Sequence, residues 1–148
     1  MNATVKHSPA FLKLVESVMP RIREVSVAEV SALSRRGGDS RGAGVMAQSE
    51  QAGPHPNPAG EGIIIDVREE SEFAAGHIPG AIHLSKGIIE RDIEAKFPDK
   101  STPLILYCGG GYRSALAADS LQKMGYVNVL SMEGGWREWR EKSLPQTA

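Results

Sequence analysis

The feature of this sequence that most constrains its fold is the segment around its single cysteine, Cys108. The apolar run 104–107 leads into Cys108, three glycines follow at 109–111, and residues 114–124 are rich in helix-forming side chains. A strand that passes through glycines into a helix gathers backbone N–H groups at the positive end of the helix dipole. We therefore expect this loop to suit a thiolate and an anion.

The residue types within the loop support this hypothesis. Glycine adopts positive φ at no steric cost, so Gly109, Gly110 and Gly111 allow successive amides to turn inward as an anion-binding nest. The helix N-terminus and the nearby Arg113 both favour a charged sulfur, which predicts that Cys108 is largely thiolate at neutral pH. The alternative is that Cys108 is a small buried hydrophobe, as free cysteines often are.

Four stretches of the sequence resemble rhodanese-family sulfurtransferases, and they occur in the family's order. They read IIDVR at 64–68, EFAAGHIPGA at 72–81, CGGGYRS at 108–114 and EGGWREW at 133–139. Together they span most of residues 22–144, and the combination is far more specific than any one of them. The resemblance implies an α/β, rhodanese-like domain with a five-stranded parallel sheet flanked by helices on both faces, and with the cysteine loop at the carboxyl edge of that sheet.

The resemblance also implies thiosulfate sulfurtransferase activity through a persulfide on Cys108. The thiolate attacks the outer sulfur of a donor such as thiosulfate, sulfite leaves, and the stored sulfur passes to a thiophilic acceptor such as cyanide or a thiol. The loop amides and the helix dipole stabilise the charged sulfur, so no separate general base is required. The residues assigned to binding the donor are Arg113, Gly109, Gly110, Gly111, Tyr112 and Ser114.

Arg68 has two interpretations. It follows Asp66 after the apolar run 63–65, at the edge where parallel sheets place their ligand sites. By similarity to the family's second arginine, Arg68 binds the anionic part of the donor. Alternatively, Arg68 forms a salt bridge with a nearby carboxylate that merely fixes the loop.

Other function classes stay open beside the thiosulfate enzyme. A persulfide carrier would transfer its sulfur to a dedicated protein partner. A phosphatase-like or non-catalytic interaction module would transfer no sulfur. Cell-cycle phosphatases of the family hold five residues between the cysteine and the arginine, whereas four lie between Cys108 and Arg113. The shorter loop favours sulfur over phosphate.

Neither a metal nor a cofactor is expected. Four histidines and one cysteine show none of the paired ligand spacings of a zinc site. His77 and His83 flank a predicted turn, and we expect them to be hydrogen-bonded structural residues. Trp136 and Trp139 lie three positions apart on a predicted final helix, where core packing explains them better than ligand stacking.

Length and charge favour a single small enzyme domain. The 148 residues carry a net charge of −1, which provides no basic field for nucleic acid or for a membrane surface. One cysteine permits no intramolecular disulfide and no resolving thiol, so the expected partners are a small sulfur-containing anion and an external acceptor, which includes a protein acceptor. No signal peptide or membrane span is predicted, and we expect a cytoplasmic monomer or weak homodimer.

The chain divides into an N-terminal extension and a domain. Residues 1–21 are predicted to form an amphipathic helical extension, with Ser8 as N-cap and Pro9 at the first helical position. Its apolar stripe docks on the domain or pairs with another subunit. The resemblance assigns residues 22–144 to the rhodanese domain, and a flexible Gly/Pro-rich insertion with too few large apolar residues to order itself is predicted at about 37–60.

The remaining pattern alternates between apolar strands and helices, which predicts a parallel sheet covered on both faces. A capping box at Ser26 and Glu29 starts a helix through Leu33. The other predicted helices are 70–75, 89–96, 113–124 and 134–142, and the predicted strands are 22–25, 62–66, 81–84, 103–107 and 127–130.

Overall fold

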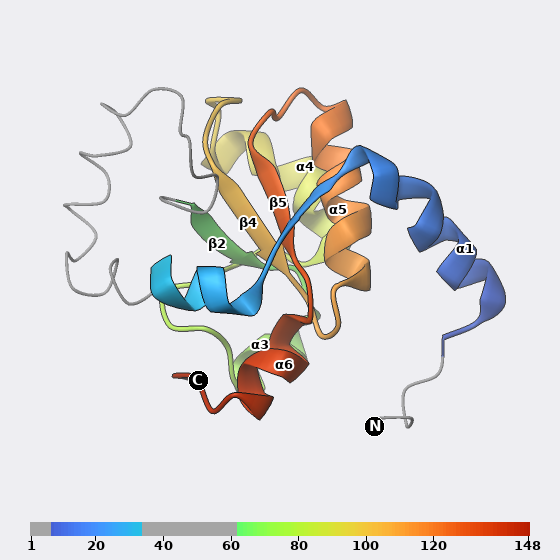
Figure 1. Cartoon of the computed structure of the whole chain (residues 1–148). Helices are drawn as coiled ribbons and strands as arrows, with labels where there is room; N and C mark the ends of the chain where they lie inside the picture. Colours follow the sequence, from blue (N-terminus) through green and yellow to red (C-terminus); the bar gives the residue numbers. More distant parts are fainter. Residues whose placement is uncertain (1–6, 34–61) are drawn as a thin grey trace.

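A sheet of five parallel strands forms the centre of the computed structural model, which describes residues 7–33 and 62–148. Its order is β1-β5-β4-β2-β3, and every neighbouring pair is parallel. Figure 1 shows the three central strands, β5, β4 and β2, in this order. The predicted α/β fold with a five-stranded parallel sheet is confirmed. The strands are β1 (Arg23–Val25), β2 (Ile63–Asp66), β3 (Ile82–His83), β4 (Leu104–Tyr107) and β5 (Val129–Met132).

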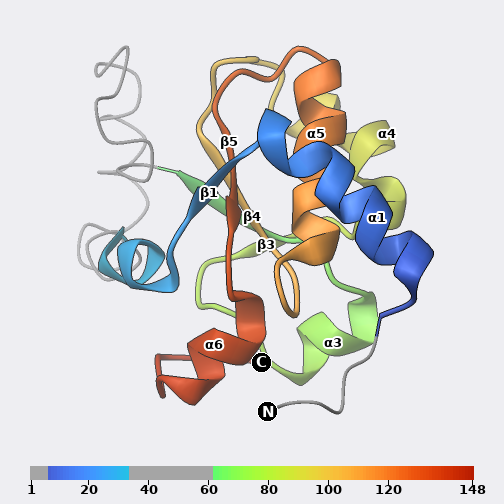
Figure 2. The same ribbon diagram turned by 45° about the vertical axis from the view of Figure 1, so that its right-hand side comes forward.

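Helices cover both faces of this sheet, because alternate side chains along each central strand enter different cores. Leu104 and Leu106 of β4 belong to the core under α1, α4 and α5, whereas Ile105 and Tyr107 belong to the core under residues 27–33 and α6. Figure 2 shows these two groups of helices on opposite sides of the sheet. The helices are α1 (Pro9–Val18), 27–33, α3 (Glu70–Ala75), α4 (Lys86–Lys96), α5 (Tyr112–Lys123) and α6 (Gly135–Glu141), and η1 (Met19–Arg21) is a single 3₁₀ turn.

Several helices and strands begin or end at other residues than the sequence predicts. The last strand begins at Val129 rather than at 127, because Val127 lies in the preceding turn, where its side chain is exposed and its N–H donates to Lys100 O. The fourth helix begins at Lys86 rather than at 89, because the Ser85 carbonyl accepts the first helical hydrogen bonds. Both changes are local, since apolar periodicity identifies elements better than it locates their ends.

The N-terminal helix α1 docks on the domain. Its Val15 and Val18 are buried in the same core as α5, and Arg21 forms an ion pair with Asp119 of α5 at 2.9 Å. The Ser8 side chain accepts from Phe11 N, as an N-cap does. The insertion predicted at 37–60 lies outside the described residues. Within the ranges that the structure describes, no helix is long and apolar enough to cross a membrane.

Candidate active site

Cys108 lies where β4 ends, one loop before the N-terminus of α5. Its Sγ accepts hydrogen bonds from Gly111 N at 3.1 Å and from Ser114 N at 3.3 Å. The whole residue is only 1% exposed, so the cysteine is enclosed by its own loop rather than open to solvent. N–H donors that converge on sulfur stabilise its charged form more than its neutral form. In the structure, the amides that converge on the Cys108 sulfur are those of Gly111 and Ser114.

The three loop glycines play different parts, which the sequence did not distinguish. Only Gly111 has a positive φ, 98°, and it begins α5 as the N-cap residue. A Cβ at Gly109 would lie 3.1 Å from Arg113 Nη2, and one at Gly110 would lie 3.6 Å from Arg137 Nη2. Gly109 therefore leaves room for the Arg113 guanidinium, Gly110 lies next to that of Arg137, and the amides that reach the sulfur come from Gly111 and Ser114.

The start of α6 is bonded directly to the cysteine loop. Trp136 N donates to Cys108 O at 2.8 Å, and Arg137 N donates to Gly109 O at 3.0 Å. This approach requires glycine at 135, because a Cβ there would lie 2.5 Å from Cys108 O. The EGGW sequence at 133–136 thus allows the start of α6 to hold the backbone of the cysteine loop by hydrogen bonds.

A buried pair of hydroxyls supports the sulfur on the sheet side. Ser114 and Ser131 are both fully buried, and their Oγ atoms are 2.8 Å apart. Ser114 Oγ also lies 3.6 Å from Cys108 Sγ. Ser114, expected to bind substrate, instead contacts the cysteine sulfur from within the protein.

Arg113 is held beside the loop by Glu72 of α3. Its Nη1 and Nη2 donate to the two carboxylate oxygens of Glu72 at 2.9 and 3.3 Å. The hydrogen bond from Arg113 lowers the pKa of Glu72, and the same bond raises the pKa of Arg113, with a further contribution from the nearby Cys108. Glu72 also receives Glu69 N in the capping box that begins α3. Glu72 therefore fixes the position of the Arg113 guanidinium and balances most of its positive charge.

Arg68 is buried and paired. It donates to both carboxylate oxygens of Asp66, with Nη2 to Oδ2 at 2.7 Å, and to Gly76 O at 2.6 Å. Its guanidinium carbon lies 4.9 Å from the centre of the Trp136 ring. Burial opposes the charge, yet the hydrogen bond and the charge of Asp66 keep the pKa of Arg68 above its ordinary value. These are the contacts that the salt-bridge interpretation of Arg68 requires.

The histidines make local hydrogen bonds, as expected for structural residues. A ring nitrogen of His77 lies 2.8 Å from Phe73 O, and one of His83 lies 2.8 Å from Arg68 O. Phe73 stacks on both rings. Trp139 is buried in the core under α6. In the part of the chain that the structure describes, no group of three or more His, Cys, Asp or Glu side chains is arranged to hold a metal ion.

Tyr112 faces the N-terminal helix rather than the sulfur. It is 38% exposed, and its ring centre lies 4.8 Å from that of His7 and 6.2 Å from that of Phe11. The extension therefore reaches the rim of the cysteine loop, a contact between distant segments.

Three residues at the site were missed by the sequence analysis: Glu72, Ser131 and Arg137. Glu72 carried one usable signal, since it occupies position N3 of a capping box. Ser131 stands within a strand, and Arg137 follows the tryptophan of a glycine motif, where nothing local points toward Cys108. Tertiary contacts alone bring these two side chains to the loop.

Comparison with known proteins agrees with this architecture. A family model for the rhodanese-like domain matches residues 47–142, which is more than half of the chain. The chain therefore belongs to the rhodanese-like domain family.

Its relatives include named sulfurtransferases and a sulfur carrier. The thiosulfate sulfurtransferase GlpE of Pseudomonas entomophila is 35% identical over 86 residues, which cover 58% of this chain and 77% of that protein. The sulfur carrier protein YrkF of Bacillus subtilis is 34% identical over 80 residues, 54% of this chain. The chain spans 42% of the length of YrkF and 64% of that of a mitochondrial relative from Schizosaccharomyces pombe.

Solved structures share the fold. The human single-domain sulfurtransferase TSTD1 has a TM-score of 0.56 and 25% identity, with 80% of this chain and 96% of that chain covered. A Rhodopseudomonas palustris protein described as a possible tyrosine phosphatase has a TM-score of 0.66 and 25% identity, with 98% of each chain covered.

Proposed function

We propose that this protein is a sulfurtransferase that carries a sulfane sulfur as a persulfide on Cys108. The observation that carries the proposal is the pair of N–H groups, from Gly111 and Ser114, that donate to the cysteine sulfur. N–H groups held in this way stabilise negative charge on an attacking sulfur. Relatives named as sulfurtransferases and as a sulfur carrier support the same chemistry.

The first step transfers the outer sulfur of thiosulfate. The Cys108 thiolate attacks that sulfur, a new S–S bond forms, and the bond to the sulfonate sulfur breaks, so that the electron pair leaves with sulfite. The terminal sulfur of the persulfide keeps the negative charge. Because the loop donors and Arg113 lie beside the sulfur, they stabilise this charge as it moves outward by one atom.

The second step returns the enzyme to its starting state. An acceptor such as cyanide or a thiolate attacks the outer sulfur, and the electron pair of the S–S bond returns to Cys108. No cysteine other than Cys108 is present, so the acceptor comes from outside the chain. Cys108 is nearly enclosed while Gly109 and Gly110 are partly exposed, so in this proposal both reactants approach the sulfur across these glycines.

The test is mass spectrometry of the intact protein after incubation with thiosulfate. We expect one added sulfur atom on Cys108, which a thiol or cyanide then removes, and no addition in Cys108→Ser. Turnover of cyanide and thiosulfate would support the enzyme, whereas a stable persulfide with little turnover would support a carrier that serves a protein acceptor.

A phosphatase is the second candidate, because a structural neighbour is described as a possible tyrosine phosphatase. Four residues between Cys108 and Arg113 make a smaller loop than five. The smaller loop disfavours a phosphate group, which the loop would have to wrap. Turnover of an aryl phosphate without sulfur on Cys108 would replace the sulfurtransferase proposal.

A further inference from the structure

Two guanidinium groups approach the cysteine loop, one beside each of its first two glycines. Arg113 Nη2 lies 3.1 Å from the position of a Cβ at Gly109, and Arg137 Nη2 lies 3.6 Å from that at Gly110. A Cβ at Gly109 would press on Arg113, whereas one at Gly110 would only touch Arg137 at van der Waals distance. The loop is therefore flanked by cations from two different helices, α5 and α6.

The two cations differ in how much of their charge is available. Arg113 shares its charge with the Glu72 carboxylate, to which both of its terminal nitrogens donate. Arg137 is exposed, and within residues 7–33 and 62–148 it forms no ion pair. An incoming anion must compete with Glu72 for Arg113, but it meets no such competitor at Arg137.

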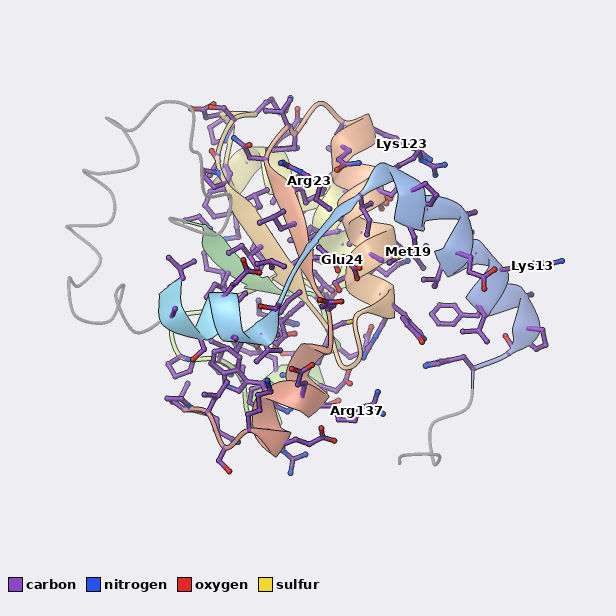
Figure 3. All side chains as sticks on the ribbon, in the orientation of Figure 1. Lys13, Met19, Arg23, Glu24, Lys123 and Arg137 are labelled. Carbon is purple, nitrogen blue, oxygen red and sulfur yellow. The ribbon has the colours of Figure 1, made fainter. Side chains whose placement is uncertain are left out.

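The position of Arg137 is fixed by its own backbone. Its N–H donates to Gly109 O at 3.0 Å, one residue from the cysteine. The side chain therefore starts from a backbone that is bonded to the loop, and its guanidinium is not held by an ion pair with any residue that the structure describes. Figure 3 shows Arg137 extending outward from α6, on the side of the loop that joins β4 to α5.

Arg68, the other candidate for anion binding, is poorly placed for that role. It is 3% exposed, and its Nε and Nη2 donate to Asp66 and Gly76 O. Exposing it to a donor molecule would leave the buried Asp66 carboxylate without its cation, which is costly.

We propose that Arg137, and not Arg68, is the second anion-binding arginine of the site and determines the preference for negatively charged sulfur donors. The inference rests on the proposed function and names the group that binds the oxyanion end of the donor. A guanidinium presents paired N–H groups that match the oxygens of a sulfonate or sulfite group. Arg137 thereby recruits thiosulfate-like anions to the loop and contributes little to the use of uncharged reagents.

The experiment compares the alkylation of Cys108 by iodoacetate, which is an anion, and by iodoacetamide, which is neutral. The rate ratio of the two reagents reports anion recruitment and requires no sulfur transfer. We expect Arg137→Gln to lower this ratio about three- to tenfold, because the lost contact is a charged but partly solvated one. Arg140→Gln, which removes an exposed arginine from the same helix, should leave it unchanged, and Arg137→Lys should restore part of it.

An unchanged ratio in Arg137→Gln, or equal losses in the Arg137 and Arg140 variants, would overturn the inference. In a second measurement, Arg137→Gln should raise the KM for thiosulfate more than it lowers kcat. A lower alkylation ratio together with no transfer of sulfur from thiosulfate would keep Arg137 as an anion-binding residue and refute the proposed function. A cysteine that reacts with neither reagent would contradict both, because no donor would reach it.

Discussion

Ser131 and Ser114 are joined through their hydroxyl groups, 2.8 Å apart, in a fully buried site behind the cysteine. Ser114 Oγ lies 3.6 Å from Cys108 Sγ, so the two hydroxyls and the sulfur form a chain. When Cys108 is a thiol, it donates to Ser114. When it is a thiolate, Ser114 donates to sulfur and Ser131 donates to Ser114, so the direction reverses without movement of heavy atoms.

Removing the Ser131 hydroxyl, which lies farther from the sulfur than that of Ser114, tests the role of this chain of groups. Ser131→Ala should slow the alkylation of Cys108 by iodoacetamide at pH 7 by up to about tenfold, because a hydrogen bond that supports a charged group contributes on the order of 1.5 kcal/mol. Ser131→Thr, which keeps the hydroxyl, should retain most of the rate. The pH dependence of alkylation measures the effect, and identical profiles for Ser131→Ala and the wild type would show that Ser131 is only a packing residue.

The Glu72–Arg113 ion pair predicts a stability change with pH. The pKa of Glu72 is lowered by its hydrogen bond with Arg113, so the folded chain binds fewer protons there than the unfolded chain does. The resulting stabilisation is present above the ordinary value of about 4.5 and is lost as pH falls through the lowered value. Because both side chains are partly exposed, it amounts to less than about 1 kcal/mol.

Urea unfolding of Glu72→Gln at pH 7 and at about pH 3 measures this effect. The variant should be less stable than the wild type at pH 7, and the difference should shrink at the lower pH, where Glu72 takes up a proton. Glu70→Gln, on the same helix, serves as the control and should change the pH dependence little. A difference for Glu72→Gln that does not change with pH would argue against the ion pair as its cause.

Arg68→Ala is expected to act on stability rather than on donor choice. It leaves Asp66 buried without its partner, at a cost of about 3–5 kcal/mol, so the melting temperature should fall clearly. Activity of the folded fraction should drop equally with thiosulfate and with a persulfide donor. A selective loss with thiosulfate, at an unchanged melting temperature, would restore Arg68 as the residue that binds the anionic part of the donor.

Gly135 fixes the distance between α6 and the cysteine loop, and its replacement should disturb both. Its φ is 59°, and a Cβ would lie 2.5 Å from Cys108 O. Gly135→Ala should cost about 1–2 kcal/mol from the left-handed backbone alone, and more from the contact. Thermal unfolding together with the alkylation rate of Cys108 detects both effects.

Gly80 provides the matched control for that substitution. Its φ is also positive, 87°, and nothing stands within 4 Å of a Cβ there. Gly80→Ala should therefore show the cost of the left-handed backbone alone, about 1–2 kcal/mol. Equal losses at Gly80 and Gly135 would show that the contact of α6 with the loop has no special importance.

Local chemistry was sufficient to predict much of this protein. Apolar runs of four or five residues, separated by amphipathic segments, specify a parallel sheet with helices on both faces, because each strand side must be buried. The N-cap at Ser8 and the capping box at Ser26 and Glu29 were also predictable and are confirmed. These features depend on residues that are neighbours in the sequence.

The tertiary structure decided which side chains meet at the sulfur. The sequence identified Arg113, but only the packing of α3 shows that Glu72 shares its charge. It also offered two interpretations of Arg68, and the Asp66 contacts favour the ion pair. Ser131 and Arg137 reach the loop from β5 and α6 because strand order and a glycine contact place these elements there. Charge balance at a site depends on such long-range packing, which no local pattern encodes.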